Sequence, residues 1–387
     1  MNEDYDLIVI GAGMAGVAAG NKCGAAGWGG AIVDALPYGG TCALRGCDPK
    51  KILRRGAEIM DAARLMQGKG IDPGDLSINW ADLMAHKRGF TDPVPDKMEK
   101  GLSGNGVETL HGAARFTGSN TLEVDGTAYQ SERFLVAAGA MPRPLSFTGA
   151  DLVIDSTDFL NLEALPNRVL FIGGGFVSFE FAHIAARAGA NPIIVDRGAR
   201  PLRGFDPDLV EMLIDRSGGI GVDLMRETEI VSVSEASRAF TVEVKSGDET
   251  RTIETDLVVH GAGRVAALAD LNLEAAGVDY SDKGIVVAPH LQSTTNSAVF
   301  AAGDSADTDG MPLTPVAVIE GKVAASNMLK DTQTAPDYAG IPTAVFTVPE
   351  VARVGMLESE ARDAGYDVDV RFTDTGDWYS NYRIGET

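Results

Sequence analysis

A glycine-rich pattern limits the possible folds of this chain more than any other feature. The strand-like segment 6–10 leads into Gly11, Gly13 and Gly16, and Asp34 follows Gly11 by 23 positions. In a strand–turn–helix–strand unit, the first glycine permits the tight turn, the second admits a pyrophosphate close to the backbone, and the third lets helix and strand pack closely. The acidic residue then binds ribose hydroxyls. The pattern therefore predicts one half of a dinucleotide-binding fold.

The same pattern occurs a second time. The strand-like segment 168–172 leads into Gly173, Gly175 and Ser178, and Asp196 follows Gly173 by 23 positions. A single glycine-rich turn is weak evidence, but two copies with the acidic residue at the same spacing indicate a repeated unit. We therefore predict an α/β fold with two Rossmann-like dinucleotide-binding domains.

The charge balance of the chain excludes several classes of protein. The 387 residues include 33 Lys and Arg but 55 Asp and Glu, which gives a formal net charge of −22. Such a surface repels phosphate backbones and anionic lipids, so we expect neither a nucleic-acid-binding nor a membrane-surface protein. No apolar run reaches the roughly 18 residues of a membrane-spanning helix. The acidic composition suits concentrated salt, although an ordinary acidic protein shares it.

The three cysteines, Cys23, Cys42 and Cys47, are too few for a disulfide scaffold. The acidic N-terminal residues lead straight into the first apolar run, so we expect no secretory leader and a soluble protein in the cytoplasm. In that compartment a close cysteine pair more often serves redox chemistry than a structural disulfide. Cys42 and Cys47 form such a pair, and their spacing fits no zinc site, so no metal is predicted.

The segment between Cys42 and Cys47 must be irregular if the two sulfurs are to meet. Five residues of a regular α-helix rotate by about 500°, which leaves the two side chains about 140° apart. Gly46 and Pro49 allow the backbone to bend. A helix that continues from Lys51 would direct its N-terminal dipole at a thiolate.

Apolar patterns and turn residues predict the remaining elements. We expect helices over 50–67 and 80–101, an antiparallel meander over 107–136, and a second set of strands over 228–260 that closes the second repeat. Residues 336–342 are expected to form a linker, followed by a strand and a short helix.

With these motifs in place, the chain resembles the FAD-dependent pyridine nucleotide-disulfide oxidoreductases, the group of glutathione reductase, dihydrolipoyl dehydrogenase and mercuric reductase. The motif that carries the resemblance is Gly40-Thr41-Cys42-x4-Cys47-x-Pro49-Lys50-Lys51. Further matches run along the whole chain, at 136–139, 261–264, 299–304, 313–317 and 342–350.

The resemblance implies a domain order. It places an FAD-binding domain over 1–150, an NAD(P)-binding domain over 151–265, a return to the FAD domain over 266–335, and an incomplete α+β interface domain over 336–387. Family members are homodimers whose His-Pro motif and following Glu serve the partner subunit as acid and base, and this motif would lie beyond Thr387. A truncated chain is therefore expected to keep flavin reduction, to reduce disulfides only weakly and to lose a stable dimer; otherwise the chain works without that base.

The resemblance also assigns roles to single residues. Cys47 would be the thiol next to the flavin, and Cys42 the exposed thiol that exchanges with a substrate disulfide. Lys51 and Glu180 would pair beside flavin N5. Asp48 replaces an apolar residue of the family and would raise the pKa of a nearby thiol. The residues expected to bind FAD are Gly11, Gly13, Gly16, Asp34, Gly40, Thr41, Lys51, Ala138, Gly139, Gly263, Asp304, Thr314, Pro315 and Ala317.

The second repeat leaves two nicotinamide cofactors open. Asp196 occupies the position that favours the free 2′-hydroxyl of NAD. Arg197 and Arg203 match the family's arginines for the 2′-phosphate of NADP, and Ser178 in place of the third glycine also favours NADP. Gly173 and Gly175 would serve either cofactor. We expect NADPH, with NADH as the alternative.

The expected function is that of an NAD(P)H:disulfide oxidoreductase. A hydride would pass through FAD to a Cys42–Cys47 disulfide and on to a small thiol disulfide, as in a glutathione reductase. One alternative is a dihydrolipoyl dehydrogenase that uses NAD. A mercuric reductase usually adds cysteines at its ends, and none occur here. The remaining alternative, from a different class, is an FAD-binding or redox-sensing protein with little disulfide turnover.

Overall fold

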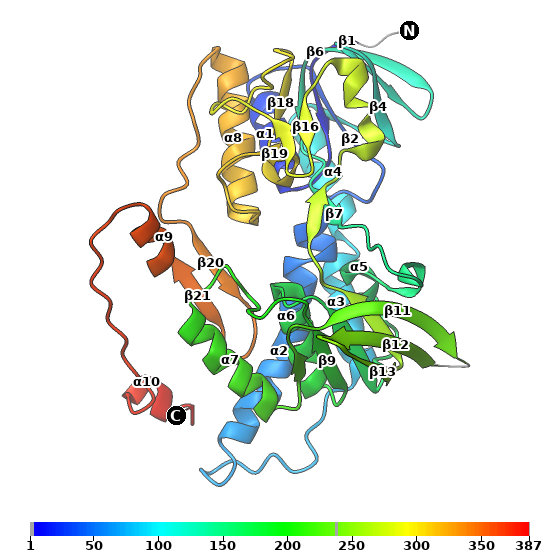
Figure 1. The fold of residues 1–387 in the computed structure, drawn as a ribbon. Coiled ribbons are helices and arrows are strands. Elements are labelled where there is room, and N and C mark those ends of the chain that lie inside the picture. The colour runs from blue at the N-terminus through cyan, green and yellow to red at the C-terminus, as the bar shows by residue number, and fades with distance from the viewer. Residues whose placement is uncertain (1–3, 237–238, 387) are drawn as a thin grey trace. The chain divides into compact units, whose positions relative to one another are not determined.

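The computed structural model describes residues 4–236 and 239–386, and these fall into two units. The first unit contains the chain up to Asp48 together with 89–143 and 264–341. The second unit contains 49–88, 144–263 and the chain from Pro342 onward. Both units are mixed α/β (Figure 1). Among the described residues, no helix is long and apolar enough to span a bilayer.

A parallel sheet forms the centre of the first unit. Its strands lie in the order β3-β2-β1-β6, and β18 also pairs in parallel with β6. The bounds of these strands are β1 (Asp4–Ile10), β2 (Gly30–Asp34), β3 (Val107–His111), β6 (Thr127–Val136) and β18 (Val299–Ala301).

The prediction of antiparallel strands over 107–136 is correct in part. The strands β4 (Ala114–Gly118) and β5 (Thr121–Val124) pair antiparallel with each other, and β5 pairs antiparallel with β6. The prediction is wrong for β3, which pairs in parallel with β2. Helices lie between β2 and β3 along the chain, and such a crossover returns the chain in the same direction.

Alternate residues of β1 face the two sides of this sheet, as strand geometry requires. Leu7 and Val9 pack with apolar residues of α1 (Met14–Ala25) and α8 (Thr314–Lys330). Ile8 and Ile10 pack on the other face, against β4, β5 and the 268–278 segment. Figure 1 shows α8 running alongside α1. The first glycine loop therefore opens a helix that is buried between sheet and α8.

The other elements of the first unit are short. They are the π-helix η1 (Thr41–Arg45), α4 (Val94–Gly104), β7 (Ala140–Pro142), β15 (Arg264–Ala266), η3 (Ala269–Leu271), η4 (Leu273–Ala276), β16 (Tyr280–Ser281), β17 (Gly284–Val286), η5 (Gly303–Ser305) and β19 (Ala306–Asp307).

The second unit contains a second parallel sheet, with the order β10-β9-β8-β14. Its strands are β8 (Arg168–Ile172), β9 (Asn191–Val195), β10 (Asp223–Met225) and β14 (Leu257–His260), and its helices are α6 (Phe176–Arg187) and α7 (Pro207–Gly219). Both glycine-rich repeats thus form parallel strand–helix–strand units, as predicted.

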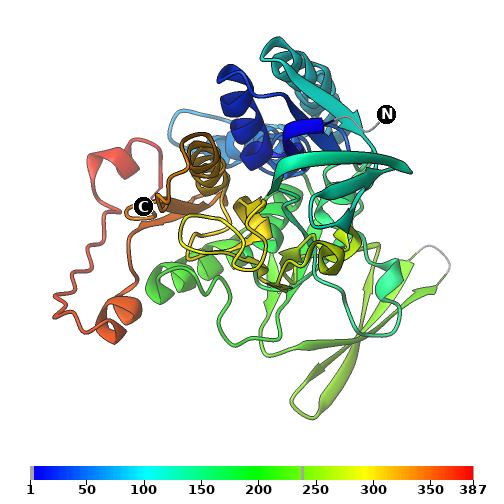
Figure 2. The same cartoon turned by 90° about the horizontal axis from the view of Figure 1, so that it is seen from above.

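A separate antiparallel sheet follows β10, and Figure 2 shows its yellow-green strands. It consists of β11 (Glu229–Ala236), β12 (Ala239–Ser246) and β13 (Glu249–Thr255). The predicted strands over 228–260 are therefore confirmed, and these three pair antiparallel. The strand β14 pairs in parallel with β8 and completes the buried Rossmann-like sheet, in agreement with the prediction that this set of strands closes the second repeat.

The predicted helices are found with different bounds. The first is α2 (Cys47–Leu65), and the second divides near Pro93 into α3 (Trp80–Thr91) and α4. The predicted strand and short helix after the linker are β20 (Pro342–Val345) and α9 (Glu358–Asp363). The remaining elements of the second unit are η2 (Ala150–Leu152), α5 (Ser156–Phe159), β21 (Val351–Val354), which pairs antiparallel with β20, and α10 (Tyr379–Tyr382).

Candidate functional site

Cys42 and Cys47 lie at the two ends of an irregular turn. Residues Thr41–Arg45 form a π-helical turn, in which backbone hydrogen bonds join residues five positions apart. This wide turn brings positions 42 and 47 nearer to one face than an α-helix would. Gly46 ends it with φ −154° and ψ −106°, which confirms the predicted bend. The following helix begins at Cys47 rather than at Lys51, and Pro49 lies in its first turn, where a proline is tolerated.

Both cysteines are thiols in this structure, and both are half-buried. Cys42, the expected exposed thiol, is therefore only partly accessible. A hydrogen bond with Cys47 and burial raise the pKa of Cys42. Asp48 raises the pKa of Cys42 further by its negative charge, in the direction that the sequence predicts for this family departure. When the pair of thiols has lost one of its two protons, the remaining proton is therefore on Cys42 and Cys47 is the thiolate.

Thr314 brings a second helix end to the cysteine pair. It is the first residue of α8, and its Oγ1 lies 3.7 Å from Cys47 Sγ, within hydrogen-bond distance. Pro315 follows in the first turn, where a proline is compatible with a helix. Cys47 is itself the first residue of α2. Helix N-termini favour negative charge, so this position is suited to a thiolate.

The first glycine loop has the geometry of a pyrophosphate-binding turn. Gly11 has φ +105°, which favours glycine, and a Cβ on Gly16 would overlap the carbonyl oxygen of Gly11. Asp34 Oδ2 accepts a hydrogen bond from the backbone N–H of Ala12 at 2.8 Å. The N-cap residue of α1 is Gly13, which has no side chain to cap the helix, so the helix end is available to a phosphate.

Three further predicted residues, Gly139, Asp304 and Ala317, meet at the short turn Gly303–Ser305. Gly139 donates its backbone N–H to Ser305 Oγ at 2.8 Å, and a Cβ on Gly303 would lie 3.2 Å from Ala317 Cβ. Asp304 lies in this turn, and Thr314 begins the helix that contains Ala317. Burial raises the pKa of Asp304, whereas Arg264 lowers it.

The second glycine loop repeats this geometry in the second unit. Gly173 has φ +95°, and the N-cap of α6, Gly175, makes no side-chain capping bond. Ser178 packs against Gly261, since a Cβ on that glycine would overlap the Ser178 hydroxyl. Within the described part of the chain, Ser178 Oγ is buried and has no hydrogen-bond partner. The loop therefore has both a free helix end and a polar atom that remains unsatisfied.

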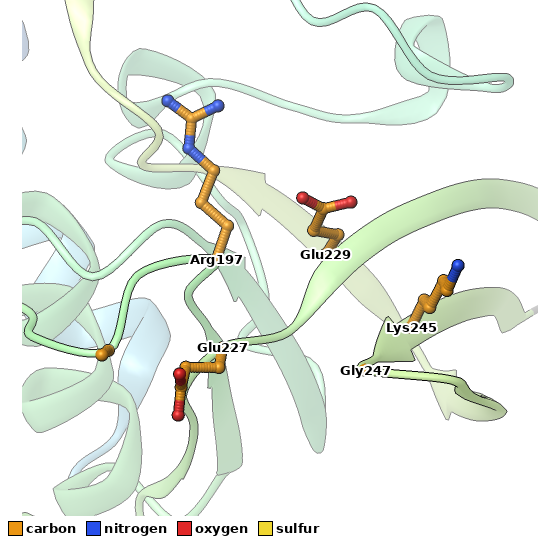
Figure 3. A pocket seen from close by; sticks show the side chains of 6 residues that line it. Arg197, Glu227, Glu229, Lys245 and Gly247 are labelled. Atoms are coloured by element: carbon orange, nitrogen blue, oxygen red, sulfur yellow. The ribbon is translucent and has the colours of Figure 1, made fainter.

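Asp196 and Arg203 lie side by side at the edge of this loop. A Cβ on Gly198 would be 2.7 Å from Arg203 Nη2 and 3.4 Å from Asp196 Oδ2. Arg197 lines a neighbouring pocket of about 310 Å³ with Glu227, Glu229 and Lys245, among others. Figure 3 shows the side chains of Arg197 and Glu227 extending in opposite directions. The two candidate phosphate-binding arginines are thus next to the acidic residue that ends the repeat.

The predicted pairing of Lys51 with Glu180 is wrong. Glu180 pairs instead with Lys50, whose Nζ lies 2.6 Å from Glu180 Oε2. Lys50 is 8% exposed and Glu180 1% exposed, whereas Lys51 is exposed. Lys50 and Lys51, three and four positions after Cys47, both lie near the same helix face as Cys47. The burial of Lys50 makes it the partner of Glu180, because a buried carboxylate requires a buried partner.

The sequence interpretation also missed Phe346. Its backbone N–H donates to Glu180 Oε1 at 2.7 Å. Lys50 Nζ lies 4.9 Å and Lys51 Nζ 4.4 Å from the centre of its ring, and the guanidinium carbon of Arg54 lies 5.9 Å from it. Lys51 therefore belongs to the same cluster through the aromatic ring, without an ion pair to Glu180.

The donor sets of the two units fit the expected cofactors. The first unit combines an open helix end at Gly13 with carboxylates at Asp34 and Asp304, which suits FAD. The second unit combines an open helix end at Gly175 with Asp196 and two nearby arginines, which suits a pyridine dinucleotide.

Comparisons with known proteins agree with this description. A family model described as pyridine nucleotide-disulphide oxidoreductase matches residues 5–321. A glutathione reductase of Burkholderia cepacia is 32% identical over 95% of this chain and 81% of that protein. A mercuric reductase of Bacillus cereus is 30% identical over 95% of this chain and 58% of that protein. A dihydrolipoyl dehydrogenase of Staphylococcus aureus is 31% identical over 94% of this chain and 78% of that protein.

Proposed function

Because the chain belongs to the pyridine nucleotide-disulphide oxidoreductase family and is an NAD(P)H-dependent oxidoreductase, we propose that it reduces a small thiol disulfide with Cys42 and Cys47. The observation that carries this proposal is the π-helical turn, which brings two cysteines five positions apart into hydrogen-bond contact. Structural thiols do not require such a turn. Glutathione disulfide is the favoured substrate, since a glutathione reductase is among the similar proteins.

In this proposal the first unit holds FAD. When bound, FAD supplies the two-electron chemistry that links NAD(P)H to the cysteine pair. Asp34 would bind the adenosine ribose, and Asp304 the ribityl and pyrophosphate part. The backbone around Gly11 and Gly13 would hold the pyrophosphate. The N-terminal end of α8 at Thr314 would stabilise negative charge next to Cys47.

The cysteine pair performs the exchange with the substrate. Deprotonated Cys42 attacks one sulfur of the substrate disulfide, so one thiolate leaves and Cys42 forms a mixed disulfide. Cys47 then attacks Cys42 Sγ, which releases the second thiolate and closes the Cys42–Cys47 disulfide. The two thiolates take up two protons, so one disulfide becomes two thiols. Two electrons from NAD(P)H return the pair to the dithiol.

The attack of Cys42 requires a base. The hydrogen bond with Cys47 and burial raise the pKa of Cys42, so the thiol holds its proton at neutral pH. The family resemblance assigns the base to a histidine of a partner subunit, and none of the five histidines of this sequence matches that family motif. Exchange by this chain is expected to become faster as the pH rises.

NADPH is the proposed reductant. Arg203 lies beside Asp196, so its positive charge offsets the carboxylate that would repel a 2′-phosphate. Arg197 supplies a second guanidinium from the adjacent pocket. Guanidinium groups bind phosphate through two parallel hydrogen bonds. The 2′-hydroxyl of NAD does not require such a partner.

A second candidate is a dihydrolipoyl dehydrogenase that uses NAD. Asp196 favours it, because this carboxylate lies directly against the second glycine loop, where a Cβ on Gly174 would collide with it. A carboxylate in that position accepts hydrogen bonds from both ribose hydroxyls of NAD.

Steady-state assays of the FAD-loaded protein distinguish these candidates. NADPH and NADH are each combined with glutathione disulfide, lipoamide or Hg²⁺, and cofactor oxidation is followed by absorbance. The proposal predicts the highest kcat/KM for NADPH with glutathione disulfide. The highest value for NADH with lipoamide would instead support the second candidate. Reduction of Hg²⁺ alone, or oxidation of NADPH that no disulfide accelerates, would contradict the proposed function.

A further inference from the structure

Glu320 is a buried carboxylate for which the proposed reaction has no role. It lies on α8 and is 1% exposed. Among the described residues, no Lys or Arg forms an ion pair with Glu320. Burial raises the pKa of Glu320, whereas its hydrogen bonds lower it. A buried carboxylate is unfavourable unless hydrogen bonds replace its water, so its partners need an explanation.

Three donors from two loops converge on this carboxylate. Oε2 accepts the backbone N–H of Gly303 at 2.6 Å. Oε1 accepts the hydroxyl of Thr308 at 2.8 Å and the hydroxyl of Tyr338 at 2.7 Å. Gly310 closes over them, since a Cβ there would be 2.9 Å from Glu320 Oε1. The side chain is thus enclosed by the loop that begins at Gly303.

The residue after Gly303 is Asp304, the expected FAD ligand, and its turn is packed against two helices. A Cβ on Gly303 would lie 3.2 Å from Ala317 Cβ of α8 and 3.4 Å from Ala15 Cβ of α1. Gly321, next to Glu320, packs so closely on α1 that a Cβ would overlap the backbone of Ala15. α1 is the helix of the first glycine loop. Glu320 therefore lies where this helix, α8 and the Asp304 turn meet.

We propose that Glu320 is a positioning residue for FAD, which holds the Gly303–Ser305 turn through the Gly303 N–H and so fixes Asp304. This inference rests on the proposed FAD site. Thr308 and Tyr338 fix the carboxylate from its other side. Hydrogen bonding, rather than the charge of Glu320, carries this role, because all three partners are neutral donors.

The test measures the dissociation constant of FAD for apoprotein, from the change in flavin fluorescence. Glu320→Leu leaves the Gly303 N–H without its acceptor and is expected to weaken FAD binding at least about tenfold, the size of one hydrogen bond to a charged group. Glu320→Gln keeps a carbonyl acceptor for Gly303 and an amide for a hydroxyl, so its dissociation constant should stay within about threefold of the wild-type value.

Glu274→Leu is the matched control. Glu274 Oε1 also accepts a tyrosine hydroxyl, that of Tyr280 at 2.7 Å, but both side chains are exposed and lie outside the Asp304 turn. This variant should bind FAD like the wild type. Thermal unfolding of each apoprotein separates stability from binding, because a residue with a merely structural role lowers the apoprotein Tm and leaves the FAD dissociation constant unchanged.

Several outcomes would overturn the proposal. A folded Glu320→Leu apoprotein with wild-type FAD affinity contradicts it, and so does a Glu320→Gln variant as weak as Glu320→Leu. If Glu320→Leu does not fold, the double variant Thr308→Val, Tyr338→Phe keeps the Gly303 bond and should weaken FAD binding about threefold; no change then contradicts the proposal. Wild-type apoprotein that does not bind FAD would instead contradict the proposed function.

Discussion

Lys50 Nζ lies 2.6 Å from Glu180 Oε2, and both side chains are buried. Removing one partner of a buried pair leaves an uncompensated charge, which destabilises a protein more than loss of an exposed charge. The adjacent Lys51 is exposed, and its Nζ lies 4.4 Å from the centre of the Phe346 ring. The two lysines should therefore differ in how much each contributes to the free energy of unfolding.

We predict that Lys50→Met lowers the free energy of unfolding by about 3 kcal/mol at neutral pH, since it leaves the buried Glu180 carboxyl group without its ion-pair partner. Lys51→Met should lower it by less than about 1 kcal/mol, the size of an exposed cation–π contact. Urea unfolding followed by circular dichroism measures both. Adding Glu180→Gln to Lys50→Met should restore much of the loss. Equal losses for the two lysine variants would show that the pair is assigned to the wrong residue.

His183 predicts a pH dependence of stability. Burial and the nearby Arg187 lower its pKa to about 3, below the value near 6.5 of an unfolded chain. Arg216 and Arg54 lower its pKa further. Its Nδ1 accepts the backbone N–H of Val348 at 3.2 Å.

Below about pH 6.5 the unfolded state therefore binds a proton on His183 that the folded state does not bind. The free energy of unfolding consequently falls as the pH falls from about 6.5 towards about 3. Between these two pH values the slope is about 1.4 kcal/mol per pH unit. His183→Gln should lower stability at neutral pH but flatten this slope, as urea unfolding at a series of pH values will show. The same slope in wild type and variant would mean that His183 is not the responsible group.

Both glycine loops were predictable because their signal is local. The turn at Gly11 and the one at Gly173 need a positive φ, and each is followed by a helix within a few residues. The bend between Cys42 and Cys47 was also predictable, since a regular helix cannot bring the two sulfurs together. Such constraints depend on neighbours in the chain.

Other parts of the site depend on residues far apart in the sequence. Glu320 meets its three donors at separations of 17, 12 and 18 positions, and Phe346 meets Glu180 at a separation of 166. No spacing rule covers such contacts. The choice between Lys50 and Lys51 as partner of Glu180 depends on which side chain is buried, and the sequence does not show this. The parallel pairing of β3 depends on its place in the whole sheet.

Arg203 tests the choice of nicotinamide cofactor. If it binds the 2′-phosphate, Arg203→Ala should raise the KM for NADPH by about tenfold to a hundredfold, because hydrogen bonds between charged groups contribute about 1.5–3 kcal/mol. The KM for NADH should change by less than about twofold. Asp196→Asn is the control with the opposite sign, and should lower the KM for NADPH while raising that for NADH. Equal effects of Arg203→Ala on both cofactors would contradict a phosphate-binding role.

The central claim is that Cys42 and Cys47 form one redox pair that NADPH reduces. Oxidised, FAD-loaded protein is treated with NADPH without oxygen, alkylated, and mapped by mass spectrometry. Cys23 is an internal control, because it is buried and its burial raises its pKa to about 12, so it should stay unmodified throughout. The account predicts that Cys42 and Cys47 are both protected before NADPH and both alkylated after it. Alkylation of either cysteine that is the same with and without NADPH would contradict the account.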